Sequence, residues 1–261
     1  MKILITGGNG YIAKSLSKGL NEHEITLITR QDFDLTDQKS TDDWFRGKFF
    51  DVVIHTAVKG GSRLIEDEGN VCYQNIQMFY NLLNNKHCFG KFIHFGSGAE
   101  LNNPIDPYGL SKKIINELIK PEPGFYNIRI FAVFDENELD TRFIKNSIKR
   151  YINKQPIEIH QDKLMDFFYM EDLVKLVKYY IKESHLPKVA ECSYVKKYSL
   201  LDIANIINSL SDYKVPIKQL DSTIGDSYIS VTTPNLKFLG LKQGILKTHN
   251  KLINNLKYKN K

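Results

Sequence analysis

The chain has 261 residues, 42% of them hydrophobic and 25% charged, and these proportions argue against intrinsic disorder. No run of about 18 apolar residues is present, so we expect no membrane span. The formal net charge is +6, but the lysines and arginines are spread along the chain, which favours a solvated basic surface over a nucleic-acid interface. The first residues lack the pattern of a signal peptide, and three scattered cysteines are too few for a disulfide framework, so we expect a cytoplasmic protein.

Apolar runs alternate with amphipathic stretches through the first half of the chain. The sequence predicts strands at 2–6, 25–29, 51–55, 92–95 and 126–131, and helices at 10–20, 41–45, 71–84 and 108–119. Such alternation is typical of a parallel sheet covered by helices on both faces. In the last third, short strands at 157–160 and 191–195 alternate with helices at 170–181 and 200–210. We therefore predict a doubly wound α/β fold with a small C-terminal lobe.

A glycine-rich turn follows the first predicted strand. Gly7, Gly10 and Ala13 are spaced three apart, and the turn opens a predicted helix. The first glycine permits a tight turn, the second lets the backbone approach a pyrophosphate, and the small third residue lets helix and strand pack closely. The helix N-terminus then faces the negative charge. This context predicts a dinucleotide site, with Tyr11 and Ile12 beside the two glycines at the cofactor.

The second predicted strand ends in Thr29 and Arg30, with no acidic residue. An acid at this point is typical of NAD sites, because it binds the adenosine ribose hydroxyls. Arg30 instead suits a ribose 2′-phosphate through its charge and planar donor fork, so we predict NADP(H) as the cofactor. The alternative is a surface arginine that merely follows the strand. Asp34 and Leu35 are expected at the adenine, with the Asp34 carboxylate accepting from its amino group.

Three polar residues on two neighbouring predicted elements form a candidate catalytic set. Tyr108 and Lys112 are one helical turn apart and therefore share a helix face. A nearby ammonium stabilises a phenolate and lowers the pKa of the tyrosine, which suits Tyr108 to acid/base chemistry at a carbinol or carbonyl. Ser97 ends the preceding strand, where its hydroxyl is expected to hydrogen-bond the same substrate oxygen.

Together these motifs resemble the extended short-chain dehydrogenases/reductases of the NAD(P)-dependent epimerase/dehydratase family. The resemblance runs nearly end to end and also rests on Asn75 and on the segments 51–58, 129–134, 166–172 and 236–241. It implies a Rossmann-like arrangement. We expect a dinucleotide-binding domain at 1–155 and a mainly substrate-binding lobe at 156–261, from which a strand and a helix return to the first domain.

The resemblance also implies the chemistry of the site. A hydride moves between the nicotinamide and a sugar carbon, Tyr108 exchanges a proton with the sugar oxygen, and Ser97 polarises that oxygen. Lys112 additionally holds the nicotinamide ribose. The implied substrate is a nucleotide sugar. The implied assembly is a homodimer in which the helices that carry Asn75 and Tyr108 pack as a four-helix bundle.

Segments 29–37 and 57–61 are most similar to the GDP-fucose synthase branch, whose members epimerise and then reduce a 4-keto-6-deoxy sugar with NADPH. Epimerisation there uses a cysteine two residues after the catalytic serine and a histidine after the next strand. This chain has Ala99 at the first position and no histidine in 134–148. We therefore predict an NADPH-dependent reductase that converts a nucleotide-linked 4-keto-6-deoxy sugar to the 4-hydroxy sugar.

Two alternatives stay open. One is a nucleotide-sugar 4-epimerase with tightly bound NAD, and the other is a non-catalytic dinucleotide-binding regulator, although the chain keeps Tyr108 and Lys112. A dehydratase is disfavoured, because dehydratases carry Asp-Glu directly after the catalytic hydroxyl residue, where this chain has Gly98 and Ala99. Glu100 follows one place later, and we interpret it as a loop carboxylate.

The remaining site predictions concern loops. Ala57 is expected at the cofactor, whereas Lys59, Gly98 and Arg142 are expected at the substrate. The arginine with which the family usually binds the substrate diphosphate is replaced here by Met165. Lys163, Arg142 and Arg150 stay open as substitutes, so the nucleotide is not identified.

Three polar residues fall within predicted apolar elements. Asn75 suits a satisfied core amide as well as a catalytic role, whereas His55 and His94 are interpreted as structural. No His, Cys or Asp cluster has the spacing of metal ligands, so we expect no metal site.

Overall fold

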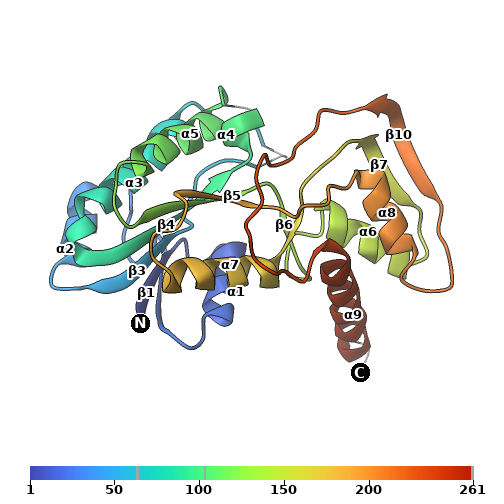
Figure 1. Cartoon of the computed structure of the whole chain (residues 1–261), viewed down its shortest axis with the longest axis horizontal. Coiled ribbons are helices and arrows are strands. Elements are labelled where there is room, and N and C mark those ends of the chain that lie inside the picture. Colours follow the sequence, from blue (N-terminus) through green and yellow to red (C-terminus); the bar gives the residue numbers. More distant parts are fainter. Residues whose placement is uncertain (63–64, 103, 260–261) are drawn as a thin grey trace. The chain divides into compact units, whose positions relative to one another are not determined.

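The computed structural model describes residues 1–62, 65–102 and 104–259 (Figure 1). The chain forms two compact units, Met1–Ile130 with Val174–Ala190, and Phe131–Leu173 with Glu191–Lys261. The sequence predicts a first domain at 1–155, whereas the N-terminal stretch of the first unit ends at Ile130. The difference arises because the residues directly after Ile130 form a strand that pairs with a later strand of the second unit. The assignment of substrate binding to that unit stays a prediction.

A six-stranded sheet forms the centre of the first unit. Its order is β2-β1-β3-β4-β5-β9, and the pairs from β2 to β5 are parallel, which confirms the predicted α/β fold. The central strands are buried along most of their length, as expected for a parallel sheet with both faces covered. The strands are β1 (Lys2–Thr6), β2 (Glu24–Ile28), β3 (Phe50–His55), β4 (Phe89–Ser97), β5 (Phe125–Ile130) and β9 (Val189–Cys192).

Helices cover both faces of this sheet (Figure 1). On one face, α3 (Asn70–Asn84) and α5 (Pro107–Ile119) pack against each other over a core of aromatic and aliphatic side chains. The other face carries α1 (Tyr11–Gly19) and the part of α7 (Met170–Lys182) that belongs to the first unit. The shorter helices of this unit are α2 (Gln38–Phe45), η1 (Lys86–Cys88) and α4 (Ala99–Asn102).

The start of α5 is fixed by its own sequence. The Asp106 carboxylate accepts a hydrogen bond from the backbone N–H of Gly109 at 2.6 Å, which caps the helix. Pro107 occupies the first helical position, where a missing N–H costs nothing. Tyr108 therefore stands in the first turn of a well-defined helix.

A row of buried polar side chains crosses the sheet near its carboxyl edge. Thr6, His55, His94 and Asn127 occupy paired positions on β1, β3, β4 and β5, and all four are buried. The Thr6 hydroxyl lies 2.8 Å from His55 Nδ1, and the His55 and His94 rings are 5.5 Å apart. Burial lowers the pKa of His55 to about 3 and that of His94 well below its ordinary value, so both imidazoles are neutral. This agrees with their interpretation as structural residues.

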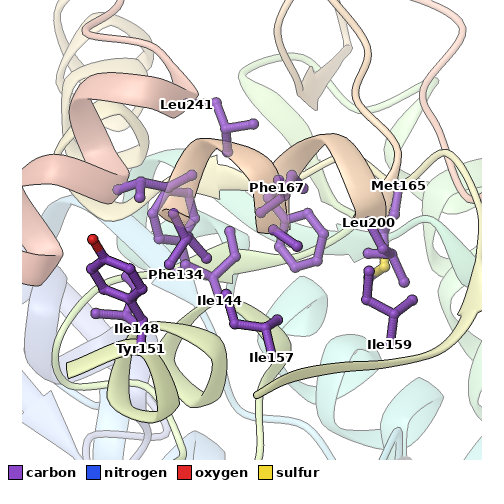
Figure 2. Close-up of a cluster of buried hydrophobic side chains, with 14 of the residues drawn as sticks. Phe134, Ile144, Ile148, Tyr151, Ile157, Ile159, Met165, Phe167, Leu200 and Leu241 are labelled. Atoms are coloured by element: carbon purple, nitrogen blue, oxygen red, sulfur yellow. The ribbon is translucent and has the colours of Figure 1, made fainter. Parts of the chain in front are cut away.

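The second unit is built around its own hydrophobic core (Figure 2). Phe134, Ile144 and Phe167 from three different segments meet in this core, and Met165 is buried among them. Two small parallel sheets, β10 with β7 and β6 with β8, border it. Its elements are β6 (Val133–Phe134), α6 (Phe143–Ile152), β7 (Ile157–Asp162), β8 (Phe168–Tyr169), α8 (Leu200–Asn208), β10 (Ile217–Ile224) and α9 (Leu241–Lys259). None of the described helices has the length and apolar character needed to cross a bilayer.

Buried Asp172 ties the segment that precedes α9 to the start of α7. Its carboxylate accepts hydrogen bonds from the backbone N–H groups of Leu239 and Gly240 at 2.8 and 3.0 Å. It also accepts one from the Tyr194 hydroxyl at 2.6 Å. The strand predicted at 191–195 ends at Cys192, and the side chains of the next two residues hydrogen-bond within this unit, Ser193 to the Thr232 carbonyl and Tyr194 to Asp172.

Candidate functional site

The glycine-rich turn between β1 and α1 has the backbone geometry of a phosphate loop. Gly7 adopts a φ of +69°, and a Cβ there would stand 2.8 Å from the backbone N and Cα of Ala57. The Gly10 N–H donates to the Gly7 carbonyl oxygen at 2.8 Å, and Gly10 is the N-cap residue of α1. No side chain of the described residues caps this helix, and its first turn holds no acidic residue. Its N-terminal N–H groups therefore suit an anion.

A cavity of about 420 Å³ opens at this turn, between the ends of β1, β2 and β3. Seven of the residues predicted from the sequence line it: Gly7, Gly10, Arg30, Asp34, Leu35, Ala57 and Lys59. Tyr11 and Ile12 lie in the first turn of α1 and are not part of its lining. The glycine turn, the helix end and the cavity together fit a dinucleotide.

Sequence reasoning missed Gln74, which also lines the cavity from α3. Its Oε1 is buried and has no hydrogen-bond partner among residues 1–62, 65–102 and 104–259. A buried acceptor without a partner costs free energy until a donor reaches it. The only signal in the sequence was a glutamine one helical turn before Met78 in the predicted helix, which does not distinguish it from a surface side chain.

Arg30 and Asp34 form a loose pair at the rim of the cavity. Arg30 Nε and Asp34 Oδ2 are 3.6 Å apart, and both side chains are largely exposed. The other carboxylate oxygen of Asp34 accepts from the Thr36 N–H and hydroxyl at 2.9 and 2.8 Å. These hydrogen bonds lower the pKa of Asp34, so its carboxylate stays charged. The predicted contact of Asp34 with an adenine stays a prediction.

Lys112 is buried and reaches from α5 to the end of β4. Its Nζ donates to the Phe95 carbonyl oxygen at 2.7 Å, two residues before Ser97. The same Nζ lies 5.7 Å from the centroid of the Tyr108 ring. Burial lowers the pKa of Lys112 to about 8, against the opposing charge of Glu100. The structure thus brings Lys112 to the Tyr108 ring and to the end of the strand that carries Ser97.

The loop after β3 lies against the Tyr108 ring. A Cβ on Gly61 would stand 2.8 Å from Cε2 and Cζ of this ring, so only glycine fits there without displacement. Gly61 has a φ of +73°, and its N–H donates to both carboxylate oxygens of Asp67 at 2.9 and 3.0 Å. Because Gly61 packs directly against the ring, the position of the Tyr108 side chain depends on the conformation of this loop.

Asn75 connects the same loop to the helix that carries Tyr108. Its side-chain oxygen accepts from the Lys59 N–H at 2.8 Å, and its Nδ2 donates to the Lys59 carbonyl at 3.0 Å. Nδ2 also lies 3.0 Å from the Ser111 hydroxyl, which donates to the Tyr108 carbonyl oxygen at 2.7 Å. Asn75 is therefore a satisfied core amide, and it links the loop to the first turn of α5.

Ser97 is buried at the end of β4, in a turn held by backbone contacts. Its Oγ accepts from the Ala99 N–H at 3.2 Å, and the Gly98 N–H donates to the Ile130 carbonyl at 2.8 Å. The interpretation of Glu100 as a loop carboxylate is wrong. Glu100 belongs to α4, is buried, and pairs with Arg129 of β5 at 2.8 Å, because its side chain turns back beneath the strand end.

Arg142 belongs to the second unit, where it directly precedes α6. Its predicted role at the substrate stays a prediction. Met165 packs in the core of this unit, so it supplies no polar group in place of the family's arginine. Arg150 donates to Glu158 at 2.6 Å. Within the described ranges no group of three or more His, Cys, Asp and Glu side chains could hold a metal ion.

The sequence of this chain is similar to those of known proteins. The NAD dependent epimerase/dehydratase family matches residues 3–191. CDP-abequose synthase from Yersinia pseudotuberculosis is 20% identical over 211 residues, which cover 71% of this chain and 75% of that protein.

Solved structures share the fold over almost the whole chain. A GDP-L-fucose synthetase from Naegleria fowleri bound to NADP has a TM-score of 0.78 at 16% identity and covers 98% of this chain and 94% of its own. A GDP-mannoheptose C4 reductase from Campylobacter jejuni with NADP bound has a TM-score of 0.75 at 16% identity, covering 97% and 98%. The UDP-glucose 4-epimerase of Thermotoga maritima has a TM-score of 0.76 at 17% identity, covering 98% and 100%.

These likenesses show a common Rossmann-like fold. The family match covers more than half of the chain and includes the glycine turn, Ser97, Tyr108 and Lys112. The chain therefore belongs to the NAD dependent epimerase/dehydratase family, enzymes of the short-chain dehydrogenase/reductase type that use a nicotinamide dinucleotide.

Proposed function

We propose that this chain is an NADPH-dependent reductase that converts a nucleotide-linked 4-keto-6-deoxy sugar to its 4-hydroxy form. The observation that carries the proposal is the buried ammonium of Lys112, held at the end of β4 and 5.7 Å from the Tyr108 ring centroid. Such a pair suits proton transfer to a carbonyl oxygen that becomes a hydroxyl. The relative and the structural neighbours described above are named as nucleotide-sugar enzymes, which supports a nucleotide sugar as the substrate.

The cavity beside the glycine turn would hold the cofactor. Gly7, Gly10 and the N-terminus of α1 would bind its pyrophosphate, and the free acceptor of Gln74 suits a hydroxyl or amino donor of the nucleoside. Lys112 would contact the nicotinamide ribose, as the family resemblance implies. When bound, the reduced nicotinamide supplies the hydride for the sugar carbon.

Arg30 supports NADPH over NADH. Its guanidinium is exposed at the rim of the cavity, and its pairing with Asp34 at 3.6 Å is an exposed ion pair, which contributes little free energy. A ribose 2′-phosphate would offer this guanidinium a doubly charged, bidentate partner at small cost. The two NADP-bound structural neighbours are consistent with this choice.

The proton would come from Tyr108. Its phenol donates to the carbonyl oxygen of the sugar, and the Lys112 ammonium stabilises the phenolate that remains. The Ser97 oxygen already accepts from the Ala99 N–H, so its hydroxyl hydrogen is left to donate to the same sugar oxygen. Ser97 would thus polarise the carbonyl before reduction.

A 4-epimerase is the second candidate, because the UDP-glucose 4-epimerase shares this fold. The two functions differ in the dinucleotide they retain. Protein that carries tightly bound NAD as purified would favour the epimerase, whereas an empty or NADP-loaded site favours the reductase. The position of Glu100 does not favour dehydration, because its carboxylate is buried in the pair with Arg129.

We also propose a homodimer formed through α3 and α5, as the family resemblance implies. Tyr73 and Tyr80 on α3 and Leu110 on α5 are exposed apolar side chains on this helix pair. Light scattering after size exclusion tests this. Tyr73→Glu should yield monomers, and a wild-type chain that is monomeric at micromolar concentration would contradict it.

The reductase assignment is tested by NADPH consumption, with NADH as control, on GDP-, dTDP-, UDP- and CDP-linked 4-keto-6-deoxy sugars. Turnover of one substrate with NADPH preferred is the expected result, and Tyr108→Phe should lower kcat by about 10²–10⁴-fold. The assignment is wrong if none of these sugars is reduced, or if Tyr108→Phe keeps most of the activity.

A further inference from the structure

A buried carboxylate lies directly behind the backbone of Ser97. The Glu100 side chain is 2% exposed, and its Oε1 accepts a hydrogen bond from the Ser97 N–H at 2.9 Å. Its Oε2 accepts from Nε and Nη2 of Arg129 at 3.0 and 2.8 Å. Arg129 is 9% exposed on the neighbouring strand β5. One carboxylate therefore joins the turn after β4 to β5.

The surrounding residues leave this carboxylate little freedom to move. A Cβ on Gly96 would stand 2.1 Å from Glu100 Oε1 and 2.4 Å from Asn127 Oδ1, so only glycine fits beside it. Asn127 Nδ2 lies 3.3 and 3.4 Å from the two carboxylate oxygens and donates to Asn116 of α5 at 2.8 Å. The carboxylate is thus connected to α5, the helix that also carries Tyr108 and Lys112.

Stability alone does not account for this arrangement. Replacing a buried ion pair by apolar side chains of similar volume is often neutral or stabilising, because two charges no longer lose their hydration. An apolar pair at 100 and 129 would also fill the space beneath the strand end. It would not accept the Ser97 N–H, and the peptide that orients the Ser97 hydroxyl would lose its anchor.

We propose that Glu100 is the positioning residue of Ser97, and that Arg129 balances the charge of its buried carboxylate. The proposal rests on the role of Ser97 in the proposed reduction. Glu100 does not touch the sugar. It fixes the Ser97 peptide, so the hydroxyl at the end of β4 meets the oxygen that Tyr108 protonates. A misplacement of about 1 Å at such a group can lower the rate by about 10²-fold.

Two double variants separate positioning from stability. Glu100→Gln/Arg129→Met removes both charges but keeps an acceptor for the Ser97 N–H, whereas Glu100→Leu/Arg129→Met removes both charges and the acceptor. We expect both to unfold cooperatively in urea, the second at a lower midpoint because it leaves the buried Ser97 N–H without an acceptor. The first should keep kcat within about threefold of the wild type, and the second should lose about 10²-fold, with the KM for NADPH unchanged in both. Asp43→Asn, which breaks an exposed ion pair on α2, is the matched control and should match the wild type.

Equal kcat values for the two double variants would overturn the proposal, as would a loss confined to the KM for NADPH. The wild type is measured first. If it reduces no 4-keto sugar, the reductase assignment is wrong, and positioning is then read by hydrogen exchange at the Ser97 amide. Exchange should be slow in the wild type and the Gln/Met variant and faster in the Leu/Met variant. Unchanged exchange in all three would refute the role of Glu100 independently of activity.

Discussion

Gly61→Ala tests whether the loop after β3 holds Tyr108 in place. Gly61 has a φ of +73°, and the new Cβ would stand 2.8 Å from two ring atoms of Tyr108, where ordinary contacts begin at 3.4 Å. The ring or the loop must therefore move by about 0.6 Å. Gly47→Ala is a matched control, because Gly47 has a φ of +72° and nothing within 4 Å of its Cβ position.

The expected magnitudes follow from these two environments. A non-glycine residue in the left-handed region costs roughly 1–2 kcal/mol, and this applies to both variants. The contact with Tyr108 adds overpacking, typically about 1–3 kcal/mol, only to Gly61→Ala. If the structure relieves the contact by moving the ring, the proton donor leaves its productive position and kcat falls by roughly 10–100-fold.

Two measurements check this reasoning. Urea unfolding should place the free energy of unfolding of Gly61→Ala below that of Gly47→Ala, and NADPH oxidation should show the loss of kcat in Gly61→Ala alone. Equal kcat values for both variants, at equal or unequal stability, would show that the loop does not position Tyr108.

Three further predictions follow from the same site. Arg30→Ala removes a charged donor to the 2′-phosphate, so we expect the KM for NADPH to rise about 10–100-fold and that for NADH to stay constant, measured by initial rates. Lys112 is charged only below its pKa of about 8, so kcat/KM should fall as the pH rises through 8, and Lys112→Arg should remove this limb from the pH profile. Asn75→Leu removes the hydrogen bonds that link Lys59 to α5, so kcat should fall about tenfold; a kcat equal to the wild type would contradict the linking role.

The features that the sequence predicts most reliably are those that depend on residues close together in the chain. Gly7 and Gly10 follow a strand and open a helix, so the turn and its geometry depend on residues a few places apart. Tyr108 and Lys112 share a helix face because they are four apart. These local patterns are sufficient for the α/β fold and for seven of the residues that line the cavity, but not for Gln74.

Contacts between distant segments escape such reasoning. Glu100 and Arg129 are separated by 29 positions, and neither is unusual in its own segment, so nothing local indicates their ion pair. β10 is missed for another reason. Most of its side chains are exposed, so it lacks the alternation of apolar and polar residues by which a half-buried strand is recognised.

The row formed by Thr6, His55, His94 and Asn127 also bears on how the sheet assembles. Successive side chains of a strand point to opposite faces, so a slip of one strand by one residue would turn its member of the row to the other face. A slipped Thr6, His55 or Asn127 side chain would then lose its hydrogen-bond partners, at a cost of about 1–3 kcal/mol for each one lost. Thr6, His55 and Asn127 therefore discriminate against competing alignments of β1, β3 and β5, whose hydrophobic runs are otherwise too uniform to select one.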